Sequence, residues 1–241
     1  MKLSPSWIAC GALATNGVFW ASVVPLVQLA NPTAIVTCAA LVAGLVTGAM
    51  IAKHAAVRPW HEPLIAALLG LVGTLVLGAR SSGYALSFAW WKWGVMIAAV
   101  SAGAVTGAML VRQFARAEST PLSTIAASMV IHLGTLGVVI LGFSRPGDGG
   151  GIEVLGIFVG TALGGFLTQL AIRRAHSATC ACGPFAYVLL VFTPGSSVRE
   201  LPAVLVGCLV MFLVAWIGSG VARRFVVGHA APAELPTARL R

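Results

Sequence analysis

The residues best suited to chemistry in this chain form one polar stripe within an apolar segment. Thr124, Ser128, His132 and Thr135 are spaced by 4, 4 and 3 residues, which places all four on one face of a helix. His132 is the one ionisable residue near the centre of an apolar stretch, and its imidazole can exchange protons or ligate a metal. The stripe predicts either a polar path with a ligand site or a set of hydrogen bonds that fixes helix packing.

Two further polar residues match the position of His132. His132 follows Pro121 by eleven residues, and Asn16 and Thr74 follow two earlier prolines by the same distance. Three helices would then carry a polar group at similar depth, although the offset fails after Pro184, where it reaches a glycine. The predicted path or ligand site consists of Asn16, Thr74, Thr124, Ser128, His132 and Thr135.

Signals for metals, cofactors and catalysis are weak. His176, Cys180 and Cys182 could give a soft metal three ligands, but the spacing is not that of a standard zinc site and a fourth partner is missing. A haem on His132 would need a second deep histidine, and the other four lie near span ends or in the tail. We expect neither a metal nor a cofactor. Motifs such as GxSxG and HExxH are absent, so an enzyme is unsupported.

The composition indicates that lipid is the solvent for most of the chain. Hydrophobic residues make up 59% of the sequence and charged residues only 9%, with a mean hydropathy of +0.96. Soluble domains carry about 25% charged residues. The length of 241 residues accommodates about eight spans of about 20 residues. We predict one transmembrane domain over 1–225 and a disordered cytoplasmic tail over 226–241.

A proline frame indicates internal repetition. An apolar stretch begins at each of four prolines, Pro5, Pro63, Pro121 and Pro184. The sequence of 43–50 is also nearly repeated at 102–109. The chain is therefore predicted to be an all-α polytopic membrane protein of four parallel two-helix hairpins, arranged as a pseudo-fourfold bundle. The predicted repeats cover about 5–62, 63–120, 121–180 and 184–225.

The distribution of Lys and Arg predicts the orientation of the spans. The spans are placed at about 7–29, 34–52, 63–79, 89–111, 122–143, 153–172, 179–194 and 202–222, the seventh being short or re-entrant. Eleven of the fifteen Lys and Arg then fall on the side that carries both termini. Because positive charge stays cytoplasmic, both termini are predicted inside. The Ala, Gly, Val and Arg bias favours a bacterial inner membrane.

Paired glycines predict close helix contacts in the even-numbered spans. A GxxxG pair places two glycines one turn apart on one helical face, so that another backbone can approach closely. We expect these helices to form an inner layer within the monomer or, alternatively, a homo-oligomer interface. The predicted packing glycines are Gly44, Gly48, Gly103, Gly107, Gly160, Gly164 and Gly220.

Two classes of function are compatible with these features. All six acids fall in loops, tails or span ends, so the mid-membrane carboxylate of many ion-coupled pumps is missing. This favours a channel or facilitator for a small solute that is not ion-coupled. The alternative is a membrane-anchoring or scaffold subunit that packs against other membrane subunits. The basic cytoplasmic rim would suit an acidic partner, and its dispersed charges argue against nucleic acid.

Overall fold

The computed structural model describes residues 5–23, 32–54, 61–82, 90–114, 121–143, 151–172 and 201–228, which are helical apart from residue 172. No strand occurs within these ranges. The seventh predicted span and the residues His176, Cys180 and Cys182 lie outside them. The helices are α1 (Pro5–Val23), α2 (Pro32–His54), α3 (His61–Ser82), α4 (Trp90–Phe114), α5 (Pro121–Phe143), α6 (Gly151–Ala171) and α8 (Leu201–Gly228).

Helix boundaries follow local chemistry. Pro5, Pro32 and Pro121 each begin a helix, where the missing N–H has no intrahelical partner to lose. α3 begins slightly before Pro63, and Glu62 occupies its first turn. A carboxylate there is stabilised by the positive end of the helix dipole. α8 continues to Gly228, so residues 226–228 are helical and do not belong to the predicted tail.

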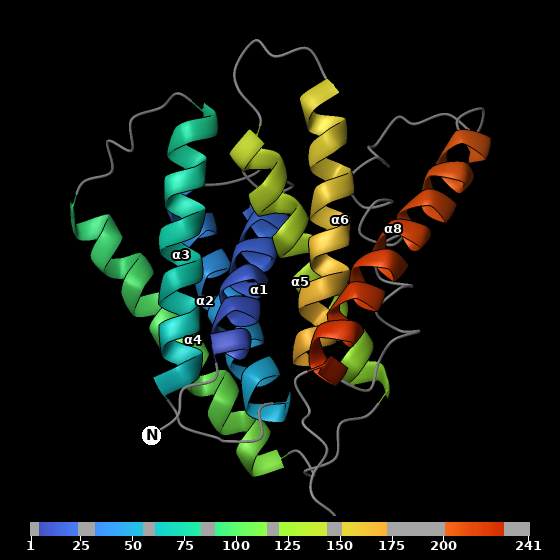
Figure 1. Cartoon of the computed structure of the whole chain (residues 1–241). Coiled ribbons are helices and arrows are strands. Elements are labelled where there is room, and N and C mark those ends of the chain that lie inside the picture. Colours follow the sequence, from blue (N-terminus) through green and yellow to red (C-terminus); the bar gives the residue numbers. More distant parts are fainter. Residues whose placement is uncertain are drawn as a thin grey trace, which may run out of the picture.

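Five of the described helices are long and apolar enough to cross a membrane: α2, α3, α4, α5 and α8. They give the chain the character of a multi-pass membrane protein. α1 does not reach this threshold, yet it packs against α2, α3, α5 and α6 (Figure 1). Its buried Thr15 and Asn16 lower its hydropathy, and the surrounding helices shield these polar groups from lipid.

The described helices alternate in direction. Gly11 lies beside Ile51 and Thr15 beside Thr47, so α1 and α2 are antiparallel. α1 and α3 are parallel, because Ala12 lies beside Gly70 and Asn16 beside Thr74 four residues later. α2 and α4 are also parallel, and so are α6 and α8.

The pseudo-fourfold arrangement is wrong for the described helices. α2 packs mainly on α4 and α6 on α8, whereas no comparable contact joins α4 to α6 or α8 to α2 within the described ranges. The even-numbered helices therefore form two separate outer pairs, and α1 takes the inner position. The faces of α2 and α4 that carry the paired glycines pack against each other. α8 contacts α6 between Met211 and Ser219 and lies apart from it nearer its start (Figure 1).

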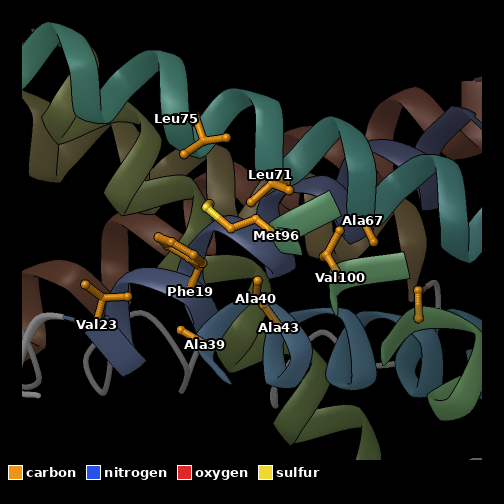
Figure 2. Packing of buried hydrophobic residues seen from close by; sticks show 11 residues of the cluster. Phe19, Val23, Ala39, Ala40, Ala43, Ala67, Leu71, Leu75, Met96 and Val100 are labelled. Atoms are coloured by element: carbon orange, nitrogen blue, oxygen red, sulfur yellow. The ribbon is translucent and has the colours of Figure 1, made fainter. Parts of the chain in front are cut away.

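Small side chains dominate the interior. One apolar cluster joins α1, α2, α3 and α4 around Phe19, Leu71, Met96 and Val100, with alanines filling the narrow spaces between them (Figure 2). Large apolar side chains instead point outward, as on α8, where Leu209 is 61% exposed. This distribution suits a bilayer, in which lipid solvates bulky side chains and small residues allow helices to approach.

Candidate functional site

His132 is the middle residue of α5 and is completely buried. Its Nδ1 lies 2.9 Å from the backbone oxygen of Ser128, one turn earlier. A carbonyl oxygen can only accept, so Nδ1 carries the proton in this hydrogen bond. In the neutral ring, Nε2 then presents a lone pair. Nε2 has no hydrogen-bond partner in the part of the chain that the structure describes.

The register between α5 and α6 brings two more polar side chains together. Leu136 lies at Gly160 and His132 at Gly164, so the helices run antiparallel in steps of four residues. The next step brings Ser128 level with Thr168. Both side chains are completely buried, and neither hydroxyl has a hydrogen-bond partner among the described residues.

Gly164 determines how much room exists beside the imidazole. A Cβ added at Gly164 would lie 2.7 Å from His132 Cδ2 and 3.2 Å from Nε2, which is too close for the ring to stay in place. The imidazole therefore packs directly against the α6 backbone at Gly164, and only glycine leaves room for the ring there. α1 also approaches here, because Cys10 Sγ lies 3.6 Å from the Leu167 backbone oxygen and is oriented to donate to it.

A second buried polar group lies between α1, α3 and α5. Asn16 Nδ2 donates to Thr74 Oγ1 at 2.9 Å, and Thr74 donates to the Gly70 carbonyl at 2.8 Å. Asn16 Oδ1 has no hydrogen-bond partner in the described ranges and faces Gly137, where an added Cβ would lie 3.2 Å away. Thr15 and Thr47 are likewise paired, with their hydroxyl oxygens 2.7 Å apart.

The structure thus divides the predicted site in two. Asn16 and Thr74 bond each other, whereas His132 and Ser128 face α6. The cause is the helical period, since positions 132 and 137 of α5 point about 140° apart. Thr135 donates to the Ile131 carbonyl at 2.7 Å, and Thr124 is half-buried near the start of the helix.

The predicted packing glycines have different surroundings. A Cβ on Gly44 or Gly48 would overlap backbone oxygens of α4, and one on Gly103 or Gly107 would overlap those of α2. Gly160 and Gly164 instead face α5. The prediction for Gly220 is not supported among the described residues, where an added Cβ would meet nothing within 4 Å. Gly165 and Gly218 make the α6–α8 contact, and Gly220 lies about 200° around α8 from Gly218, so it points away from α6.

Sequence reasoning missed several residues that the structure brings together. They include the Thr15–Thr47 pair, Thr168, and the close approach of Gly17 to Gly134 between α1 and α5. Each is a polar or small residue inside an apolar stretch, which is the signal that could have found it. Among the described residues, no three His, Cys, Asp or Glu side chains come together as metal ligands.

The comparisons with known proteins leave the site as the main evidence for function. No family model, curated protein or solved structure matches the chain.

Proposed function

We propose that the chain is a membrane permeation protein, a channel or facilitator, for a small uncharged solute. The path follows the contacts of α5 with α6 and α1. One observation carries the proposal: His132 Nε2, Ser128 Oγ and Thr168 Oγ1 are buried on α5 and α6 without hydrogen-bond partners in the described ranges.

Such atoms are expensive if their only role is packing. Burying a polar group without a hydrogen bond costs roughly 2–7 kcal/mol in an apolar environment. Other hydroxyls avoid this cost by donating to a carbonyl four residues earlier, as Thr15, Thr74 and Thr135 do. Ser128 and Thr168 do not. A passing solute that hydrogen-bonds to these groups would offset the cost.

The proposal assigns a neutral solute that moves down its own gradient. Within the described helices, acidic and basic residues lie toward the ends and no carboxylate lies at mid-span. Glu62 is completely buried, but it belongs to the first turn of α3. An ion-driven pump would need a titratable or ion-binding acid deeper in the membrane.

Reconstituted liposomes provide the test. Stopped-flow light scattering would follow vesicle swelling with acetamide, urea and glycerol, with and without a sodium or proton gradient. We expect faster swelling than in protein-free vesicles for at least one solute, independent of either gradient. Equal swelling in both vesicles for all three, or a rate that requires a gradient, would contradict the proposal.

A scaffold subunit is the second candidate, favoured by the large apolar surface of α8. Leu209, Leu213 and Trp216 are about half exposed or more, and either lipid or another membrane subunit could cover them. The mass of the particle extracted in mild detergent from the native host separates the two. A small multiple of 24.7 kDa supports the permeation protein, and co-purifying chains support the scaffold.

The setting of the protein is part of the proposal. We place it in a bacterial inner membrane with both termini in the cytoplasm, where Lys53 and Arg112 would contribute to a basic rim. Trp91 and Lys92, whose ammonium lies 5.7 Å from the indole centroid, would then mark the outer interface. An acidic cytoplasmic partner suits the rim, and nucleic acid is not expected.

A further inference from the structure

The geometry points to the chemical class of the solute: a small neutral molecule that donates a hydrogen bond, such as a primary amide, bound by the lone pair of His132 Nε2. This inference rests on the proposed function and adds the binding position and its selectivity.

The polarity of the position follows from His132. Its Nδ1 is committed as a donor to the Ser128 backbone oxygen at 2.9 Å, which leaves Nε2 as an acceptor. Nε2 is unpartnered within the described ranges, and the side chain is fully buried. A ligand at this atom must therefore supply an N–H or O–H group.

The hydroxyls one turn away complete the recognition. Ser128 Oγ and Thr168 Oγ1 are also buried and unpartnered in the described part of the chain, and a hydroxyl can either donate or accept. A ligand that donates to Nε2 can thus place its own acceptor toward these groups. A primary amide carries both functions on the same carbon, as an N–H donor and a carbonyl acceptor.

Size and charge narrow the class further. His132 packs directly against Gly164, so the surroundings of Nε2 are tight, which favours a small unsubstituted N–H donor over N-alkylated analogues. Among the residues of α1, α5 and α6, the one carboxylate is Glu153 in the first turn of α6, far along the helix from Gly164. Anions would also meet the acceptor lone pair and be repelled.

The test uses the whole protein in lipid nanodiscs with ¹⁵N-labelled histidine, and follows the Nε2 resonance that disappears in the His132→Leu variant. The probes are acetamide and acetone, which have nearly the same shape and differ in the N–H donor. We expect a saturable shift with acetamide and none with acetone. We also expect Gly164→Ala to weaken acetamide binding about tenfold, which corresponds to a loss of about 1.4 kcal/mol of binding free energy. Gly220→Ala is the control, and its affinity for acetamide should be unchanged.

Three outcomes would overturn the inference: a ring that carries its proton on Nε2, equal shifts with both probes, or a resonance insensitive to acetamide because only water occupies the position. The probe comparison needs only the wild-type protein, so it stands even if Gly164→Ala fails to fold. Failure of the proposed function is distinguishable, because it would leave the acetamide shift intact while the liposomes showed no transport.

Discussion

Asn16 on α1 donates a hydrogen bond of 2.9 Å to Thr74 on α3, and the two residues occupy matching positions after Pro5 and Pro63. Both side chains are almost fully buried. The hydrogen bond joins α1, the central helix, to α3, which is apolar enough to span a membrane. It therefore fixes the lateral position of α1, on which the α5 contact also depends.

We expect Thr74→Val to destabilise the protein by about 1–3 kcal/mol, because it leaves the Asn16 amide buried without an acceptor. Asn16→Leu removes the other partner, and the double variant should recover part of the loss. Thermal unfolding in detergent would give the coupling energy. Additive effects of the two substitutions would show that the bond contributes nothing.

Glycine contacts between outer helices predict a second effect on stability. Gly107→Ala places a methyl group on the Leu45 backbone oxygen, so α2 and α4 must separate. We expect a loss of about 1–3 kcal/mol, typical of overpacking. Gly220→Ala should stay within about 0.5 kcal/mol, since its Cβ meets open space in the described part of the chain. Equal unfolding temperatures for the two variants would contradict this arrangement.

Two adjacent glycines of α6 separate function from assembly. Gly164 faces His132, whereas an added Cβ on Gly165 would overlap the Ala215 backbone oxygen on α8. We expect Gly164→Ala to reduce solute flux in protein that still folds, because the imidazole can turn aside. Gly165→Ala should instead lower the amount of folded protein, because the backbone of α8 cannot move away from the added methyl group as easily as a side chain can. Size-exclusion profiles and liposome flux would be measured for both, and the reverse pattern would refute the assignment.

The proposed orientation predicts which side of the membrane each terminus occupies. A fluorescent-protein fusion at the C-terminus should fluoresce in bacterial cells, and an alkaline phosphatase fusion there should be inactive. The same fusions after residue 145, in a predicted outer loop, should give the opposite results. Active phosphatase at the C-terminus would mean that the span count or the charge rule fails for this chain.

Much of the local structure was predictable because lipid imposes strong constraints on sequence. The proline positions and the length of the apolar stretches located helices such as α5, whose predicted span 122–143 differs from the helix by one residue at its start. The approach of α2 to α4 through Gly44 and Gly103 likewise followed the pattern of small residues, because only glycine allows backbones to meet in this way.

The arrangement of the helices was less predictable, because a repeat does not determine how its copies pack. Asn16 and His132 matched in sequence position, yet they face different neighbours because the matching ignored rotation about the α5 axis. Gly220 was misplaced for a similar reason, since it lies about 200° around α8 from Gly218, the glycine that faces α6. α1 is central because the surrounding helices shield its polar residues Thr15 and Asn16. The sequence of one helix alone does not show which other helices will surround it.

The most direct test of the account is the uptake of labelled acetamide into liposomes by three variants reconstituted in equal amounts. They are the wild type, His132→Leu and the control Thr161→Val, which alters a buried residue of α6 that contacts Met211 on α8. We expect uptake above that of protein-free vesicles for the wild type and Thr161→Val, and at least a tenfold loss for folded His132→Leu. Equal uptake by all three, or none by the wild type, would contradict it.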